Sequence, residues 1–171
     1  MNKSKYYFSY NQIHQTIARG AKDILDSNFD PNIIIAIGGG GFIPARILRT
    51  FINKPILTVS ISYYSSIDNL PTTPQEHQWL NSIDIEDKKI LVVDEVDDTR
   101  VTLEYCLNRL FAHNPAEIAV FVLHNKLKPK QGQYPKGIKH IFIGENLDDR
   151  WISYPWDAKD INEHTGHTND K

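Results

Sequence analysis

The stretch from residue 89 to 103 constrains the fold most, because an apolar run ends there in a cluster of acids. Ile90 to Val93 are all apolar, which is typical of a parallel strand buried on both faces. Carboxylates, hydroxyls and then apolar residues at helical spacing follow: Asp94, Glu95, Asp97, Asp98, Thr99, Thr102, Leu103, Leu107, Leu110 and Phe111. This order predicts a strand, an acidic loop and a helix N-terminus, and open α/β sheets bind ligands beyond the carboxyl ends of such strands.

Two kinds of chemistry meet in this acidic loop. Backbone N–H groups that open a helix, helped by the hydroxyls of Thr99 and Thr102, form a seat for a phosphate group. Carboxylates would repel that phosphate, so we expect them to hold ribose hydroxyls, a magnesium ion or a proton. The combination indicates a sugar phosphate as ligand. The alternative is a solvated acidic loop that only caps the helix.

The segment from Val92 to Leu103 resembles the 5-phosphoribosyl-1-pyrophosphate (PRPP) motif of type I phosphoribosyltransferases. The resemblance implies that Asp94 and Glu95 bind the ribose 2′ and 3′ hydroxyls and that Asp98 is the catalytic acid beside the purine N7. Arg100 stands where most members carry Gly, and its side chain could add charge to the phosphate site. The implied PRPP-binding set is Asp94, Glu95, Asp97, Asp98, Thr99, Arg100, Val101 and Thr102.

A second loop follows the β-branched run from Ile33 to Ile37, which predicts another buried strand. Glycines allow the backbone to approach a ligand closely, and four follow in a row: Gly38, Gly39, Gly40 and Gly41. A dinucleotide-binding fingerprint would need glycine at Ile43, so that motif is excluded. The helix expected next has Pro44 in its first turn. A purely structural turn is the alternative to a ligand loop.

This glycine run resembles the pyrophosphate-binding loop of purine phosphoribosyltransferases, which often contains a non-proline cis peptide bond. Many members carry Arg or Lys where this chain has Gly39. The resemblance therefore implies that pyrophosphate binding rests on backbone N–H groups, with Arg46, Arg49 or magnesium supplying positive charge.

A third strand is predicted from Ile56 to Ile61, and the chain from Ser62 to about Glu86 is then polar without a clear period. A loop of this length in a compact domain is either a functional lid or a plain linker. The resemblance favours a lid over the reacting centre, and its candidate residues are Ser62, Tyr63 and Tyr64.

The purine side of the site is expected from two later segments. A strand from Ala116 to Leu123 ends at His124-Asn125-Lys126, and a further short strand is expected from Lys139 to Ile143. The resemblance implies that Lys126, or failing that Lys128, reads the purine 6-oxo group. On the sequence alone an ordinary exposed lysine is the alternative.

The segment around Trp151 is similar to the base-binding segment of bacterial xanthine-guanine and fungal hypoxanthine-guanine enzymes. That similarity implies that Trp151 stacks on the purine and that the Ile152 carbonyl faces the purine 2-position. It also implies a metal site in which Asp157 binds magnesium through water, close to Asp94 and Glu95. Trp156 is expected in the core instead.

Length and composition set the outer limits. A chain of 171 residues predicts one domain over residues 1–171, with a polar tail from about residue 161. The net charge of −2 and the lack of a basic block argue against nucleic-acid and membrane partners. Cys106 is the single cysteine and is expected to be a small buried hydrophobe. No long apolar stretch follows the first residues, so a cytoplasmic protein is expected.

Taken together, the three motif regions resemble a 6-oxopurine phosphoribosyltransferase. The implied fold is the α/β type I phosphoribosyltransferase fold, a central, mainly parallel sheet flanked by helices, with a small hood from the terminal segments. The implied reaction joins hypoxanthine, guanine or xanthine to PRPP with Mg²⁺ as cofactor, and relatives are usually homodimers or homotetramers. A PRPP-binding regulatory protein of the same fold and a general nucleotide-binding module are the alternatives. The preference among the three bases stays open.

Overall fold

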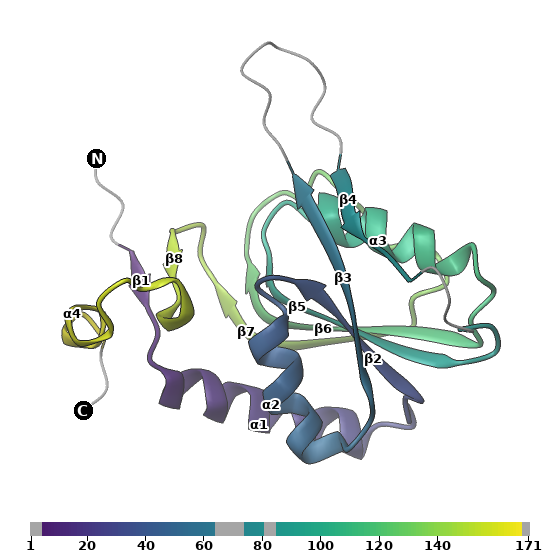
Figure 1. Ribbon diagram of the computed structural model, residues 1–171, viewed down its shortest axis with the longest axis horizontal. Helices are drawn as coiled ribbons and strands as arrows, with labels where there is room; N and C mark the ends of the chain where they lie inside the picture. The colour runs from purple at the N-terminus through teal and green to yellow at the C-terminus, as the bar shows by residue number, and fades with distance from the viewer. Residues whose placement is uncertain (1–4, 64–73, 81–84, 169–171) are drawn as a thin grey trace, which may run out of the picture.

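The computed structural model describes residues 5–63, 74–80 and 85–168, and its centre is a six-stranded sheet (Figure 1). The strands lie in the order β4-β3-β2-β5-β6-β7. Neighbours pair in parallel except β3 and β4, which are antiparallel, so the expectation of a mainly parallel sheet is confirmed. The bounds are β2 (Ile33–Gly38), β3 (Ile56–Tyr63), β4 (Pro74–Gln78), β5 (Lys89–Asp97), β6 (Glu117–Lys126) and β7 (His140–Leu147).

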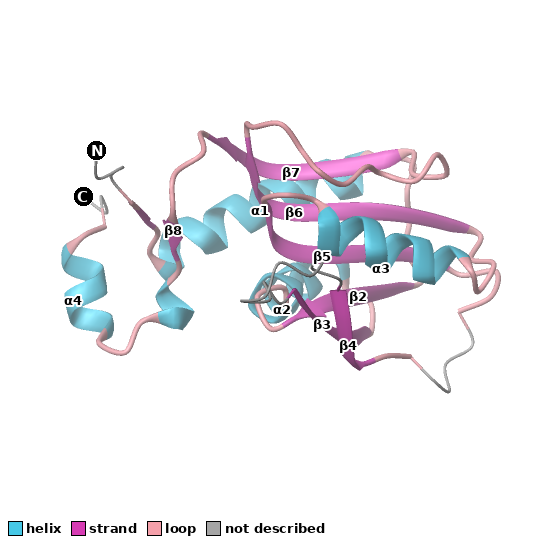
Figure 2. Cartoon of the chain, turned by 90° about the horizontal axis from the view of Figure 1, so that it is seen from above, coloured by secondary structure: helices cyan, strands magenta, loops and turns pink. Residues whose placement is uncertain are grey.

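Helices cover both faces of the sheet, and Figure 2 shows α1 and α3 on opposite sides of it. The helices α1 (Tyr10–Asp26) and α2 (Phe42–Ile52) pack on one face, and α3 (Val101–Phe111) packs on the other. Alternate residues of β5 point to the two faces, so Leu91 and Val93 join the first core and Ile90 and Val92 join the second. The continuous apolar run in the sequence is therefore explained by burial on both faces.

The cysteine and the helix starts behave as the sequence predicts. Cys106 lies on the buried face of α3 and is fully buried, and burial raises the pKa of its thiol. Helix α1 begins with a capping box in which the Ser9 hydroxyl accepts from the Gln12 N–H at 3.1 Å, while the Gln12 side chain accepts from the Ser9 N–H at 2.9 Å. Among the described residues, no helix is both long and apolar enough to cross a membrane.

A small hood is built from the two ends of the chain, as expected, and lies beside the sheet in Figure 1. It contains β1 (Tyr6–Tyr7), β8 (Ile152–Ser153), the short 3₁₀ helix η1 (Pro155–Asp157) and α4 (Ile161–Gly166). Strands β1 and β8 pair in parallel, with Tyr6 opposite Ile152. The N-terminal segment is thereby fixed to the segment that was expected to bind the base.

The polar segment expected from about residue 161 begins with a folded element, α4. The Asp160 carboxylate caps this helix by accepting from the N–H groups of Asn162 and Glu163 at 2.8 and 3.0 Å. His164 is buried, and its Nε2 lies 2.9 Å from the Phe8 carbonyl oxygen. A polar segment can thus be held by caps and by one buried histidine.

The expected long loop between Ser62 and Glu86 is partly wrong, because β4 forms inside it and pairs with β3. The Glu76 carboxylate of β4 accepts from Arg109 Nε at 2.6 Å and from the Tyr105 hydroxyl at 2.8 Å, both on α3. These contacts stabilise a strand that has no apolar alternation. Of the candidate lid residues, Tyr64 and the Tyr63 side chain lie outside the described residues. The Ser62 hydroxyl lies 2.6 Å from His77 Nε2.

Candidate active site

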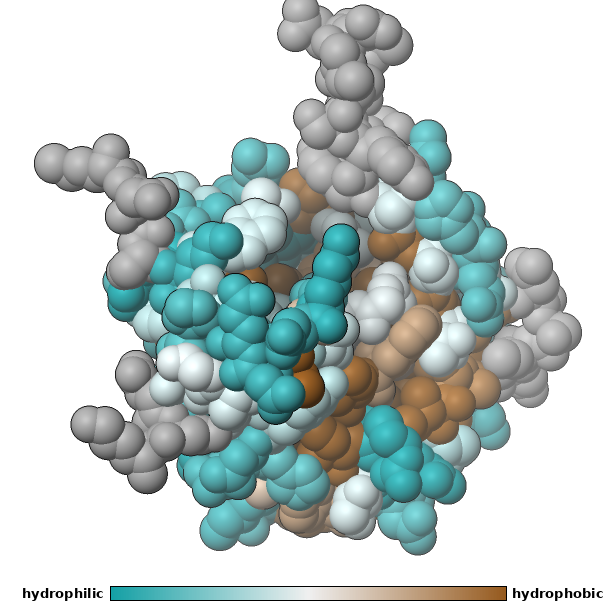
Figure 3. Space-filling model, turned by 60° about the vertical axis from the view of Figure 1, so that its left-hand side comes forward, coloured by the Kyte–Doolittle hydropathy of each residue, from teal (hydrophilic) through white to brown (hydrophobic). Residues whose placement is uncertain are grey.

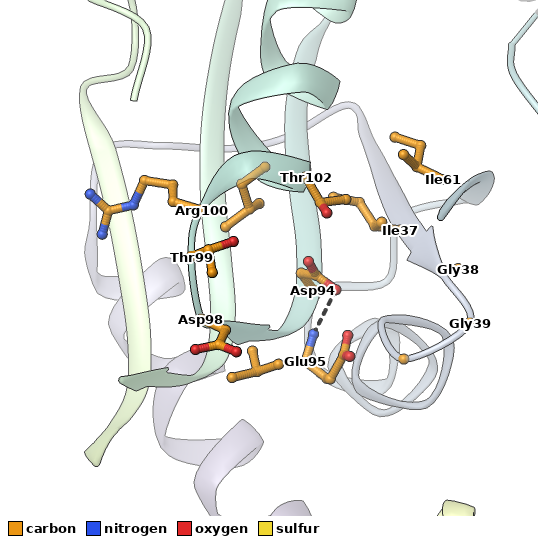
Figure 4. A pocket seen from close by; sticks show the side chains of 13 residues that line it. Ile37, Gly38, Gly39, Ile61, Asp94, Glu95, Asp98, Thr99, Arg100 and Thr102 are labelled. Atoms are coloured by element: carbon orange, nitrogen blue, oxygen red, sulfur yellow. Dashed lines mark hydrogen bonds between the residues drawn. The ribbon is translucent and has the colours of Figure 1, made fainter. Parts of the chain in front are cut away.

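A cavity of about 320 Å³ lies where the carboxyl ends of β2, β3 and β5 meet the start of α3 (Figure 4). It is placed where open α/β sheets bind ligands. The glycine loop forms one wall and the acidic loop forms the other. The lining residues are Ile37, Gly38, Gly39, Gly40, Ile61, Asp94, Glu95, Val96, Asp98, Thr99, Arg100, Thr102 and Leu103.

Two glycines of the loop lie in close contact with neighbouring residues. A Cβ atom at Gly40 would lie 2.0 Å from the Glu95 carboxyl carbon, and one at Gly41 would lie 2.6 Å from the carbonyl oxygens of Ile37 and Val93. A Cβ at Gly39, in contrast, would meet nothing within 4 Å. The peptide bond between Gly38 and Gly39 is cis, as the resemblance implied. The loop therefore presents bare backbone to the cavity.

In the acidic pair of β5, Asp94 is buried and Glu95 is half-buried. Asp94 is only 7% exposed, and its Oδ1 accepts from the Glu95 backbone N–H at 3.0 Å (Figure 4). Burial, followed by the nearby Glu95 carboxylate, raises the pKa of Asp94 well above its ordinary value. A cation or a pair of sugar hydroxyls at this point would offset the repulsion between the two carboxylates.

Asp98 lies at the rim of the cavity and has the opposite shift. Burial acts to raise the pKa of Asp98, but the ammonium groups of Lys128 and Lys126 outweigh it, so this pKa lies below its ordinary value. Lys128 forms a close ion pair with Asp98, and Lys126 Nζ lies 3.4 Å from the same carboxylate. Both lysines also reach Asp149, at 3.2 and 3.9 Å. Asp98 is thus an ionised acceptor at neutral pH.

Thr99, Arg100 and Thr102 form the turn that opens α3. Arg100 is the N-cap and has a left-handed backbone conformation with φ 67°, which explains why glycine suits this position. Its guanidinium donates to Asp97 Oδ2 from Nε at 2.9 Å and from Nη2 at 2.7 Å. Figure 4 shows the side chain directed away from Asp94. The expectation that this side chain adds charge to the phosphate site is therefore not supported.

Asp97 does not line the cavity, although the resemblance placed it in the PRPP-binding set. Its side chain is 1% exposed and lies against Arg100, Lys130 and Tyr134. Strand β5 ends at Asp97, and Asp98 follows it in the turn that leads to α3. Asp97 and Asp98 therefore separate, and only Asp98 reaches the cavity. Val101 also lies outside the lining residues.

The expected purine-binding residues lie beyond this cavity. Lys126 is buried at the end of β6 and is joined to the site through Asp98. Trp151 is 68% exposed in the hood, and Ile152 is buried in β8. None of the three lines the cavity.

The expected metal ligands come from both the sheet and the hood. Asp157 is exposed in η1, three residues after Tyr154. Burial first, and then the charges of Glu95, Asp94 and Asp157, raise the pKa of Tyr154. Among the described residues, no three metal-binding side chains form a cage. The donor set fits an ion that keeps water and substrate oxygens as ligands.

Arg46 and Arg49 do not reach the glycine loop. Arg46 Nη1 donates to the Thr50 hydroxyl at 3.2 Å, and Arg49 Nε donates to the Lys54 carbonyl at 3.2 Å. Both contacts follow α2 toward its C-terminus, away from Gly39. Neither arginine lines the cavity.

Tyr154 and His124 connect the hood to the acidic pair, and sequence reasoning missed both. The Tyr154 hydroxyl donates to the Glu95 carbonyl at 3.2 Å and lies 2.8 Å from Nδ1 of the fully buried His124. The ring of Phe8 stacks on His124 at 4.3 Å. A histidine at the end of an otherwise apolar strand was the available signal, because a buried polar side chain needs a partner.

Comparison with known proteins identifies the family. The profile of the Phosphoribosyl transferase domain matches residues 9–159. The hypoxanthine-guanine phosphoribosyltransferase of Schizosaccharomyces pombe is 44% identical, and the match covers 98% of this chain and 96% of that protein. The xanthine phosphoribosyltransferase 1 of Saccharomyces cerevisiae is 38% identical, and the match covers 94% and 93%.

A solved structure agrees with this assignment at the level of the whole fold. It is the crystal structure of a hypothetical protein from Neisseria gonorrhoeae with bound ppGpp. That chain is 43% identical with a TM-score of 0.91, and the match covers 96% of this chain and 95% of that one. The resemblance stated from the sequence is confirmed, and the chain belongs to the phosphoribosyl transferase domain family.

Proposed function

We propose that this protein is a purine salvage enzyme that transfers the 5-phosphoribosyl group of PRPP to a 6-oxopurine base. The products would be the nucleoside 5′-monophosphate and pyrophosphate. The observation that carries the proposal is one cavity that places a bare glycine loop opposite an acidic pair, with a helix N-terminus beside them. The close relatives named as purine phosphoribosyltransferases support the same reaction.

Each part of the substrate has a matching part of the cavity. Asp94 and Glu95 would accept hydrogen bonds from the ribose 2′ and 3′ hydroxyls. The N–H groups of the turn at Thr99 would hold the 5′-phosphate, with the hydroxyls of Thr99 and Thr102. The glycine loop would face the pyrophosphate. Such binding leaves C1′ open toward the hood, where the base would enter.

The chemical step breaks the bond between C1′ and the pyrophosphate oxygen and forms the bond between C1′ and purine N9. Positive charge builds on the ribose as the leaving group departs, and the nearby carboxylates stabilise it. The imidazole ring of the base loses electron density to the new bond, so the N7 proton becomes more acidic. Asp98, held ionised by its lysines, would accept a hydrogen bond from N7 and then the N7 proton, which leaves the purine ring of the nucleotide uncharged.

Magnesium is proposed as the cofactor for two reasons. The cavity lining carries three carboxylates, Asp94, Glu95 and Asp98. The guanidinium of Arg100, which also lines the cavity, is turned toward Asp97. An anion as charged as pyrophosphate needs a cation there. Mg²⁺ commonly uses one or two carboxylates together with substrate phosphates and water. Asp94 and Glu95 would hold it, with Asp157 through water. When bound, Mg²⁺ would neutralise charge on the leaving group.

The reaction is tested by measuring pyrophosphate release from PRPP with hypoxanthine, guanine, xanthine and adenine supplied one at a time. Turnover with any 6-oxopurine and little with adenine is the expected result. It would also name the preferred base, which relatives named for hypoxanthine-guanine and for xanthine leave open. Tight PRPP binding without turnover on any base would instead favour the regulatory alternative.

A second candidate function is the binding of ppGpp, which a 43% identical structure contains. This ligand combines guanine, a ribose and two diphosphate groups, so its parts match those assigned to the base, the ribose and the phosphates. We infer that ppGpp competes with PRPP for the cavity. Inhibition that PRPP overcomes at high concentration would support this, and inhibition unaffected by PRPP would place ppGpp elsewhere.

Self-association is a further proposal, supported by hydrophobic side chains on the surface. Figure 3 shows hydrophobic side chains gathered on one part of the face seen from the hood side. Among the exposed large hydrophobic residues, Tyr10 lies on α1 and Phe42 and Phe51 lie on α2. We propose a homodimer or homotetramer, which light scattering would test.

The cytoplasmic location and the lid stay predictions.

A further inference from the structure

A chain segment outside the cavity holds the phosphate-binding turn from behind. This segment, residues 130–134 in the connection between β6 and β7, is called the brace. The backbone N–H groups of Gln131 and Gly132 both donate to the Thr99 carbonyl at 3.0 Å. A Cβ atom at Gly132 would lie 2.6 Å from the Arg100 carbonyl oxygen, so the two backbones are in close contact.

Lys130 completes this contact with its side chain. Its Nζ donates to the Asp97 carbonyl at 2.5 Å and to the Asp98 carbonyl at 3.1 Å. The same ammonium lies 3.5 Å from Asp97 Oδ1. The carbonyls of three successive residues, from Asp97 to Thr99, therefore all point toward the brace.

The side chain of Asp97 joins the turn to the brace a second time. It accepts from Arg100 Nε at 2.9 Å and from the Tyr134 hydroxyl at 3.1 Å. The Arg100 guanidinium also lies over the Tyr134 ring, 4.1 Å from its centre. A side chain that is 1% exposed and bound by both a cation and a hydroxyl can occupy few other positions.

These contacts fix the direction of the N–H groups that face the cavity. In a trans peptide unit the C=O of one residue and the N–H of the next point in opposite directions. Carbonyls of Asp97, Asp98 and Thr99 that point into the brace therefore turn the N–H groups of Asp98, Thr99 and Arg100 toward the opposite side, where the cavity lies. A cation on the carbonyl side also polarises these peptide groups and strengthens their N–H groups as donors.

We propose that Lys130 and Tyr134 are positioning residues that hold the 5′-phosphate seat in its binding form. Neither residue lines the cavity. The inference rests on the proposed function, because it assigns the turn to the 5′-phosphate of PRPP and of the nucleotide product. It also gives Asp97 and Arg100 a role: they attach the turn to the brace instead of touching substrate.

The test compares a nucleoside with its own 5′-monophosphate. The ratio of the dissociation constants of inosine and inosine 5′-monophosphate measures what the 5′-phosphate adds to binding. In Lys130→Met this ratio should fall about 10-fold, as expected for losing a charge-assisted contact. Binding of magnesium pyrophosphate, which uses the glycine loop, should not change. Lys136→Met, an exposed lysine in the same connection, is the matched control and should keep the wild-type ratio.

Tyr134→Phe gives an independent measurement, because it removes the hydroxyl on Asp97 and keeps the ring beneath Arg100. A smaller fall of the same ratio is expected, about 3-fold for one neutral donor. This change is small enough to retain the fold if Lys130→Met does not. An unchanged ratio in Tyr134→Phe and in any folded Lys130→Met protein would overturn the inference.

The proposed function fails separately from the inference. If the wild-type protein binds inosine 5′-monophosphate but shows no turnover with any purine, the reaction is wrong while the phosphate seat remains. If the wild-type ratio is already close to one, both are wrong, because the turn then binds no 5′-phosphate.

Discussion

The loops after β2 and after β5 form opposite walls of one cavity, yet they are built in opposite ways. The β2 loop is a run of glycines, and the close contact of Gly41 with two backbone oxygens excludes a side chain at that position. The β5 loop is dense in charged side chains, and the brace holds it from behind. One wall presents only backbone to the cavity, and the other presents ionised side chains as well as backbone.

The difference shows how a single cavity can hold two anionic groups and acidic catalytic residues together. In the proposed function, phosphate oxygens would meet backbone N–H groups on both walls, and these groups carry no full charge. The carboxylates have distinct environments, since burial raises the pKa of Asp94 and two lysines lower that of Asp98. Environments that separate two carboxylates in this way also separate their tasks.

Replacing the charged group in the β5 wall should have the largest effect. Asp98→Asn keeps the shape and removes the acceptor proposed for N7, so kcat should fall about 10²- to 10⁴-fold. PRPP binding should be nearly unchanged, because the ribose and phosphate contacts lie elsewhere in the cavity. Steady-state kinetics and direct PRPP titration would measure the two effects.

Asp149→Asn is the matched control for Asp98. Asp149 contacts the same two lysines, at 3.9 and 3.2 Å, but does not line the cavity. Its loss should change kcat much less than the loss of Asp98. Equal effects from the two variants would mean that Asp98 acts only by holding the lysines.

Adding one methyl group to the β2 wall should have the next largest effect. In Gly41→Ala the new Cβ would lie 2.6 Å from two backbone oxygens that cannot rotate away. We expect unfolding free energy to fall by about 1–3 kcal/mol, the usual cost of overpacking. Thermal or denaturant unfolding measures this. Gly39→Ala adds the same methyl group where nothing lies within 4 Å, and it should leave stability almost unchanged.

The contrast between the two walls also explains how much the sequence could predict. Both strand-end loops were recognised because each follows a continuous apolar run, and that local pattern also predicted the doubly covered sheet. The role of Asp97 was missed because β5 continues to Asp97, beyond the expected strand end, and turns that side chain away from the cavity. A strand end inside a run of acids gives no compositional signal.

The brace and β4 were missed for a different reason. The Tyr134 hydroxyl contacts a residue 37 positions away, and Glu76 contacts Arg109 over 33 positions. Such pairs depend on the packed fold, and no periodicity in the sequence encodes them. No role was therefore predicted for the brace residues.

The third prediction concerns how the β5 wall is held against the hood. His124 is fully buried, and burial lowers its pKa to about 3. The unfolded chain takes up a proton near pH 6.5 while the folded chain stays neutral, so folding loses stability as pH falls below 6.5. Between pH 7 and pH 5 this loss should be about 2 kcal/mol. In His124→Gln that part of the acid sensitivity should disappear.

Denaturant unfolding at the two pH values gives the measurement. His124→Gln is expected to be less stable than the wild type at pH 7, because it alters the contact with Tyr154. Its loss between pH 7 and pH 5 should nevertheless be smaller. His113→Gln, at an exposed histidine, should retain the wild-type loss. An equal loss in His124→Gln and wild type would show that His124 does not cause the acid sensitivity.

The smallest effect is expected from adding one positive charge to the glycine wall, at Gly39. Gly39 has open space for a side chain and no positive φ, and the resemblance places Arg or Lys there in many relatives. Gly39→Lys should therefore fold and bring one cation to the pyrophosphate, tightening PRPP binding about 2- to 5-fold, as for a solvent-exposed ion pair. The gain should be largest at low magnesium and should shrink as salt rises. Gly39→Met has a similar length without charge, so an equal gain in both variants would contradict an electrostatic cause. A gain confined to Gly39→Lys would mean that Arg46 and Arg49 supply no charge to the pyrophosphate in the wild type. The wild-type glycine wall would then bind pyrophosphate through its backbone and magnesium alone.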